Sequence, residues 1–285
     1  FQAEDGIRDA QESRGLGDVY KRQVEGTDNV AVGWSALKTE NAHGGNVAIG
    51  KEALKTLDAG AEGYNVAIGL VAGKLMTTGT SNTIIGAFAG DSLTTGNNNV
   101  AIGRSALSLE DAHGTNVAVG FATLANLNAG ADALNTALGY AAGNLMTTGT
   151  FNTLVGGEAG DALTTGVSNV ALGFAALSSA QTSNYNTAIG ERALHLNVNS
   201  NRNTALGFQA LYNHTTANAT DSYNTAVGYS AGSAITTSTE NTLIGGLAGD
   251  ALTTGSANVA VGLSLIHISE PTRLLSISYA VFCLK

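Results

Sequence analysis

A five-residue word recurs fourteen times along this chain and constrains its fold more than any other feature. The word is Asn, then Val or Thr, then a small or branched apolar residue, then Val, Ile or Leu, then Gly. Of the thirteen spacings between copies, ten are 17 residues, two are 19 and one is 21, and the extra residues always precede an Asn. Such a period is typical of a stacked array, and one loop of the repeat absorbs the insertions.

The repeat predicts an all-β chain, folded as a parallel β-solenoid of about 14 coils with 17 residues per coil. The position three after Asn is Val, Ile or Leu in all fourteen copies, so we expect this column to face the core. The position two after Asn is Ala in eleven copies. It would point the other way and approach a second sheet or a neighbouring chain. A helical array is excluded by glycine, which costs about 1 kcal/mol at each helix-interior position.

Each word opens with Asn and closes with Gly. Gly permits the backbone conformation of a corner, and Asn side chains can stack into a hydrogen-bonded amide ladder from coil to coil. We therefore predict a structural ladder along the array. Its members are Asn46, Asn65, Asn82, Asn99, Asn116, Asn135, Asn152, Asn169, Asn186, Asn203, Asn224 and Asn241.

The position eight residues after Asn is Leu in some coils and Gly in others. Where Gly stands there, as at Gly73, the residue three further on is large and apolar, as at Met76. Where Leu stands there, that later residue is often polar: Glu40, Glu110, Asn197 and His214. The exchange predicts that core volume stays level from coil to coil.

The two ends of the chain carry no repeat and are related to each other through their coding DNA. Codons can be chosen for residues 13–23 (SRGLGDVYKRQ) whose reverse complement encodes residues 263–273 (LSLIHISEPTR). We interpret residues 1–23 and 263–285 as translated sequencing-adapter segments, which are left out of fold reasoning. The natural segment is then the array, residues 24–262, and we expect it to be a fragment lacking its native ends.

Composition within the array excludes several classes of function. The single Pro (Pro271) and the single Cys (Cys283) lie outside it, so neither a disulfide nor a cysteine-based metal site is expected. From Asn29 to Gly262 there are 14 Asp and Glu against 7 Lys and Arg, a net charge of 7 − 14 = −7. We therefore expect no nucleic-acid partner. The array contains no run of about 20 apolar residues, the length that a membrane-spanning helix needs, so we expect no membrane span in it.

The motifs NTAIGERAL at Asn186 and NTAVGYSAG at Asn224 resemble the short repeats of bacterial and phage tail-fibre-domain proteins. They are also similar to the head repeats of trimeric autotransporter adhesins. This resemblance covers residues 29–262 and implies a β-roll that assembles as a homotrimer. It also implies an extracellular location, at a bacterial cell surface or on a virion.

Candidate chemical groups are few. His43 and His113 occupy matching segments, ENAHGG and EDAHGT, which we interpret as two copies of one surface loop without a metal. Asp91, Asp161 and Asp250 recur too far apart to converge on one calcium ion, so we expect them to cap turns. We predict no catalytic, cofactor-binding or metal-binding residue and no cofactor.

The position five after Asn is often aromatic and is predicted to face solvent or a partner. Such a column could pack between coils or chains, or contact a host-cell receptor or glycan. The candidate partner-contact residues are Trp34, Phe121, Tyr140, Phe174, Phe208 and Tyr229.

These observations predict a non-enzymatic structural or adhesive repeat region of a bacterial surface adhesin or phage tail fibre. One alternative is a self-contained monomeric solenoid, for example an ice-binding protein, suggested by recurring Thr-Thr-Gly turns such as that at Thr77. The other is the stalk of a glycan-active enzyme, which would need a carboxylate pair that the sequence does not display.

Overall fold

The computed structural model describes residues 28–40, 44–216, 218 and 220–263. The segments interpreted as adapter-derived therefore lie outside the described residues, except for Leu263. The fold confirms the predicted class, an all-β parallel solenoid of about 13 turns with roughly 17 residues per turn. The described part of the chain contains strands and turns and no helix.

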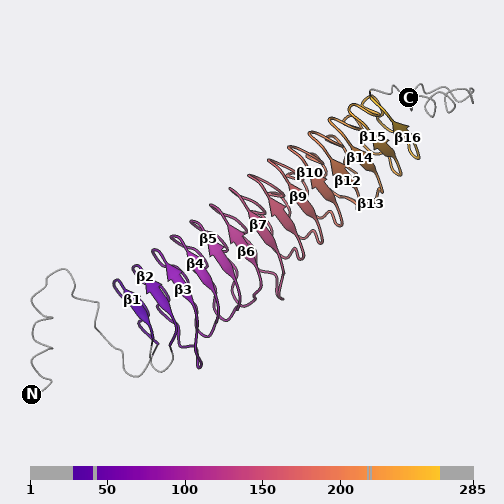
Figure 1. Cartoon of the computed structure of the whole chain (residues 1–285). Coiled ribbons are helices and arrows are strands. Elements are labelled where there is room, and N and C mark those ends of the chain that lie inside the picture. The colour runs from indigo at the N-terminus through magenta and orange to yellow at the C-terminus, as the bar shows by residue number, and fades with distance from the viewer. Residues whose placement is uncertain (1–27, 41–43, 217, 219, 264–285) are drawn as a thin grey trace, which may run out of the picture. The chain divides into compact units, whose positions relative to one another are not determined.

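The chain divides into two compact units. The first comprises residues up to Ala122 together with Gly130–Asp132, and the second comprises Thr123–Ala129 and residues from Ala133 onward. Figure 1 shows the strands of each unit stacked side by side. The first unit contains β1 (Val30–Val32), β2 (Val47–Ile49), β3 (Val66–Ile68), β4 (Thr83–Ile85), β5 (Val100–Ile102) and β6 (Val117–Val119).

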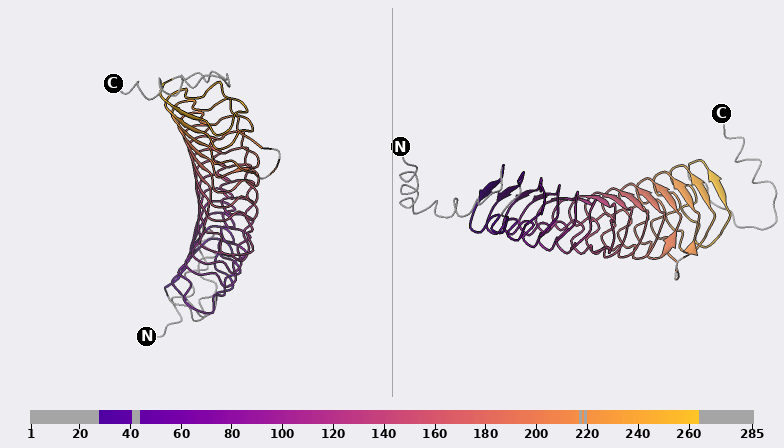
Figure 2. Two further views of the ribbon diagram at one scale, coloured as in Figure 1. Left: turned by 90° about the vertical axis from the view of Figure 1, so that its right-hand side faces the viewer. Right: turned by 90° about the horizontal axis from the view of Figure 1, so that it is seen from below.

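The second unit holds the remaining strands and a small additional sheet. Its main strands are β7 (Thr136–Leu138), β8 (Thr153–Val155), β9 (Val170–Leu172), β10 (Thr187–Ile189), β12 (Thr204–Leu206), β14 (Thr225–Val227), β15 (Thr242–Ile244) and β16 (Val259–Val261). A separate parallel pair joins β11 (Ser200–Asn201) to β13 (Thr220–Asp221), away from the main strands (Figure 2).

Each strand consists of the three central residues of one word, and neighbouring words pair in register. Val47 lies opposite Val66 although 19 residues separate them, and Thr204 lies opposite Thr225 across 21 residues. The insertions therefore lie outside the strands and leave the pairing unchanged, as their position before each Asn predicts.

The prediction that the Val, Ile or Leu column faces the core is wrong. Ala137, in the middle of β7, is fully buried, whereas Leu138 is 46% exposed, and the same pattern holds in the other internal strands. The cause is the Asn that opens each word, because its side chain points into the coil and successive strand residues alternate. Asn inside places the middle residue inside and the branched residues on the outer surface.

Three words carry a large residue at the middle position, and each is matched by a glycine. Ile84, Leu154 and Leu243 are buried there, and the residue six positions later is Gly90, Gly160 or Gly249. A Cβ added at Gly160 would lie 2.9 Å from the Cδ2 atom of Leu154. The Leu-to-Gly exchange seen in the sequence thus makes room for the middle residue as well as for the side chain that follows.

The glycine that ends each word is required by the stacking of coils. Gly86 has a φ of 136°, and a Cβ built on it would lie 2.5 Å from the carbonyl oxygen of Gly103 in the next coil. Any side chain here would therefore push neighbouring backbones apart.

Candidate functional site

The outer surface of the main strands is accessible and mostly apolar, and we call it the strand face. It consists of the first and third residues of each strand, which are Val or Thr and then Val, Ile or Leu. Leu172 on β9 is 44% exposed, and Leu206 and Ile244 are exposed to a similar extent. Because the strands pair in register, these side chains align in two columns along each unit. Contiguous apolar surface of this kind usually marks an interaction site.

Inside the coils, the Asn side chains that open the words form an amide ladder. In the first unit the backbone N–H of Asn82 donates to the Oδ1 atom of Asn65 at 3.0 Å, and Asn99 donates to Asn82 at 2.9 Å. In the second unit Asn169 donates to Asn152 at 2.9 Å, and its Nδ2 atom also donates to the carbonyl of Ser183 at 2.8 Å. The twelve residues predicted as the ladder are all buried.

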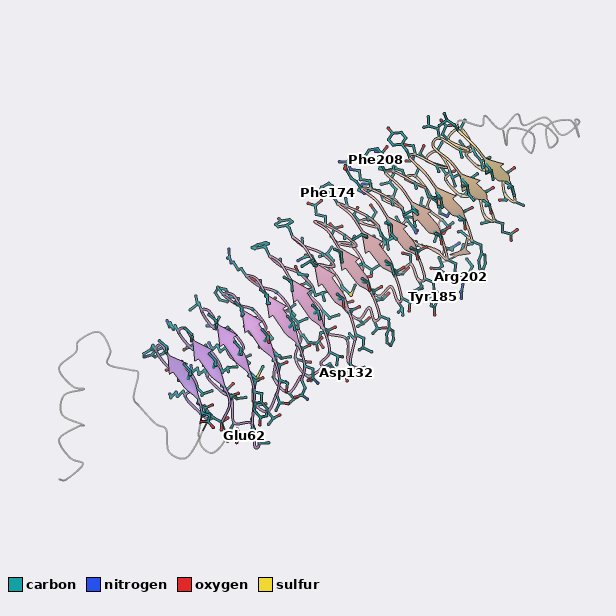
Figure 3. The ribbon with its side chains drawn as sticks, in the orientation of Figure 1. Glu62, Asp132, Phe174, Tyr185, Arg202 and Phe208 are labelled. Carbon is teal, nitrogen blue, oxygen red and sulfur yellow. The ribbon has the colours of Figure 1, made fainter. Side chains whose placement is uncertain are left out.

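The aromatic column lies at the carboxyl ends of the strands and is exposed. Phe208 and Tyr229, from successive coils, stack with ring centroids 5.3 Å apart and planes 9° apart. Arg104 lies over Phe121 of the following coil at 5.9 Å from the ring centroid. Figure 3 shows Phe174 on the same edge of the strands as Phe208. Phe121 and Phe208 thus contact the equivalent residue of a neighbouring coil, and Tyr229 remains 59% exposed, open to a partner.

A cluster of lysines surrounds Trp34 at the first coils of the first unit. The ammonium groups of Lys51 and Lys55 lie 5.3 Å and 5.9 Å from the centroid of the Trp34 ring. Glu52 accepts from Lys74 at 2.8 Å and from Lys55 at 2.9 Å. These two bonds, with Lys74 the larger influence, lower the pKa of Glu52 to about 2. The cluster is the main concentration of positive charge in an acidic array.

A second exposed column precedes the strands, and sequence reasoning missed it. Arg202 lies between Tyr185 and Tyr223 of the neighbouring coils, 4.6 Å and 5.9 Å from their ring centroids, and its Nε donates to Asp221 at 2.9 Å. Tyr185, Arg202 and Tyr223 each directly precede the Asn that opens a word. The recurrence of Tyr at that position was the available signal. The strand face is thus bordered on both sides by aromatic side chains.

A serine and a histidine from successive coils also meet, 17 residues apart. The Oγ atom of Ser178 lies 2.7 Å from the Nδ1 atom of His195, which also lies 3.2 Å from the carbonyl oxygen of Ala175. When Nδ1 donates to that carbonyl it cannot take a proton from Ser178. Ser178 is also buried, and the imidazole stacks on Tyr212 at 5.1 Å. The arrangement fits a packed polar turn better than a nucleophile with its base.

The polar residues that alternate with large apolar ones lie inside the coils. Glu110, Asn197 and His214 are fully buried and Glu40 nearly so. Burial lowers the pKa of His214 to about 4. Its Nε2 atom lies 3.4 Å from the Nδ2 atom of Asn224. These interior polar groups were visible in the sequence only as exceptions to an apolar column.

Comparison of the chain with protein-family models, with curated proteins and with solved structures finds no match. Within the described residues, no helix has the length and apolar character needed to cross a membrane.

Proposed function

We propose that this chain is a non-enzymatic structural repeat region of an extracellular fibre, an adhesin of a bacterial surface or a phage tail fibre. In this proposal it assembles with copies of itself through the strand face. The observation that carries the proposal is the exposure of branched apolar side chains on successive, in-register strands. A solitary chain in water would gain nothing from keeping this surface apolar, whereas self-association buries it.

The size of the strand face supports association. With strands about 4.8 Å apart and three residues spanning about 10 Å, six strands of the first unit present roughly 290 Å² and eight of the second roughly 380 Å². These values lie near the lower end of the range for the largest apolar patch of a typical monomer, about 300–600 Å², and such patches are often functional. The resemblance of the repeats to trimeric adhesin heads favours a homotrimer.

The oligomeric mass tests the proposal. We expect sedimentation equilibrium to give three times the chain mass for the wild type, and a monomer for Leu172→Lys, which places a charge on the strand face. Leu145→Lys is the matched control, because Leu145 is 51% exposed but lies in a turn outside the strand face. It should remain trimeric. A monomeric wild type would contradict the proposal and favour a self-contained solenoid.

Adhesion to a receptor or glycan would use the aromatic column, which borders the strand face and stays partly open. Flat rings half exposed to water suit stacking against sugar rings. A glycan array probed with the wild type should then give signals that Tyr140→Ala weakens and Leu145→Ala does not. Equal signals from both variants would remove the aromatic column from the adhesive surface.

Ice binding is the second candidate, and one observation favours it. Thr187, Thr204, Thr225 and Thr242 occupy the first strand position in successive coils and form a regular outward row. The Thr-Thr turns are less suitable, since their hydroxyls bond to neighbouring carbonyls, as Thr164 does to Gln181 at 2.9 Å. Thermal hysteresis of a monomeric chain, abolished by Thr204→Lys, would support ice binding over assembly.

A further inference from the structure

We propose that Glu110, Asp111 and His113 form a binding site for a divalent transition-metal ion of the zinc type. The three residues belong to one turn of the first unit. One ligand atom from each, two carboxylate oxygens and an imidazole nitrogen, lie within 4.8 Å of one another. This site is separate from the strand face and does not depend on the proposed function.

The three side chains differ in burial in a way that suits a site open on one side. Glu110 is fully buried, the His113 side chain is 28% exposed, and Asp111 is exposed. A metal ion would therefore be bound by the buried carboxylate of Glu110 on its inner side and by the exposed carboxylate of Asp111 on its solvent side.

The separation of the two inner ligands favours an ion over a direct hydrogen bond. The Oε1 atom of Glu110, which accepts from the backbone N–H of His113 at 3.2 Å, lies 3.5 Å from the Nδ1 atom of His113, and Nδ1 is buried without a hydrogen-bond partner. Good N–H···O bonds measure about 2.7–3.2 Å. Two ligands of one tetrahedral zinc, each about 2.0–2.1 Å from the metal, lie roughly 3.3 Å apart. The observed gap therefore fits an edge of a coordination tetrahedron.

The backbone of the turn is held by both neighbouring coils, so the ligands are preorganised. The carbonyl of Asp111 accepts from the hydroxyl of Thr94 in the preceding coil at 2.6 Å, and the carbonyl of His113 accepts from Asn99 of its own coil at 3.1 Å. From the following coil Asp132, labelled in Figure 3, accepts from the N–H of Gly114 at 2.9 Å. A rigid turn loses little conformational freedom when an ion binds.

The ligand set selects the class of metal. One imidazole and two carboxylates with an open fourth position match zinc and its neighbours, nickel and cobalt. Magnesium and calcium prefer oxygen ligands alone and more of them. The expectation that His113 lies in a plain surface loop did not foresee that its partner Glu110 would be buried beneath it.

The repeat supplies a near copy for comparison. Residues 40–43 read Glu-Asn-Ala-His where residues 110–113 read Glu-Asp-Ala-His. Asp111→Asn therefore converts the proposed site into a sequence that the chain already carries, which makes it a conservative variant. It replaces a charged ligand by a weaker neutral one.

Titration with zinc alone tests the proposal on the full chain after removal of metal by a chelator. We expect calorimetry to show a site whose affinity falls at least about tenfold in Asp111→Asn and further in His113→Ala, since even the loss of a group that only supports a metal ligand costs about 10–100-fold. His43→Ala, the control, should leave that site intact. Cobalt bound at the site should show the intense visible absorption of tetrahedral geometry, absent in His113→Ala.

Circular dichroism of the metal-free variants separates ligand loss from misfolding. Asp111 is exposed, so Asp111→Asn should unfold at the wild-type temperature without metal while binding zinc less tightly. Equal zinc affinity in the wild type and His113→Ala, or no binding by the wild type, would overturn the proposal.

Discussion

The inner and outer faces of each three-residue strand differ in residue type and in burial, although their residues alternate along the chain. The inner face carries the Asn that opens the word and a middle residue that is usually Ala, both buried, whereas the outer face carries mostly branched apolar side chains that are partly or fully exposed. In most soluble sheets the larger apolar side chains face the core. Here the buried Asn before each strand fixes the alternation, so the first and third strand residues point outward and the large core side chains come from the turns, as Leu54 and Met76 do.

The largest effect should come from cavity formation on the inner face. Leu154→Ala removes a fully buried side chain opposite a glycine, and we expect a loss of about 2–5 kcal/mol in the free energy of unfolding. Leu138→Ala, on the outer face of the adjacent strand, should cost under about 1 kcal/mol in the monomer because its side chain is 46% exposed. Denaturant unfolding of both variants checks this. Equal losses would mean that the two faces are equally important for folding.

The amide ladder should be nearly as sensitive. Asn169→Ala leaves the buried N–H of Asn186 without its acceptor at 3.0 Å and the carbonyl of Ser183 without a donor. The expected loss is on the order of 3 kcal/mol, since two buried groups lose partners that cost about 1–3 kcal/mol each when unmet. Asn128→Ala, an exposed asparagine, is the control. Equal melting temperatures of the two variants would show that the amide ladder does not stabilise the fold.

Acid should weaken the interior through His214. Its pKa is about 4 in the folded chain against 6.5 when unfolded, so in this window the unfolded state binds the additional proton and stability falls as the pH falls. From about pH 7 to about pH 5 we expect a loss of roughly 2 kcal/mol. His214→Leu, which installs the residue found at Leu127, should flatten this dependence. A wild type and variant with the same pH profile would contradict the assignment.

The smallest effect should come from the outer aromatic column. Phe208→Ala breaks a stack between two partly exposed rings, which is worth about 0.5–1.5 kcal/mol. The variant should melt only slightly below the wild type. A loss as large as that of Leu154→Ala would show that the aromatic column belongs to the folding core.

The sequence alone predicted the fold class, the coil length, the register and the loop that absorbs insertions, because each depends on spacing. It did not predict which face was inside. The invariant Val, Ile or Leu column had the composition of a core, and only the hydrogen bonds of the Asn side chains decide otherwise. The contacts of Ser178 with His195 and of Arg202 with Tyr185 join residues of neighbouring coils. Aligning the sequence at the 17-residue period shows which positions become neighbours, but not the geometry of their contacts.

Every rung of the amide ladder joins residues only 17, 19 or 21 positions apart. A growing chain therefore never has to wait for a distant segment before it can add its next coil, since the template is always the coil just completed. Folding of this kind nucleates locally and extends like a zipper, with fast rates for its size. The same property lets whole coils be gained or lost in evolution without rearranging the remainder.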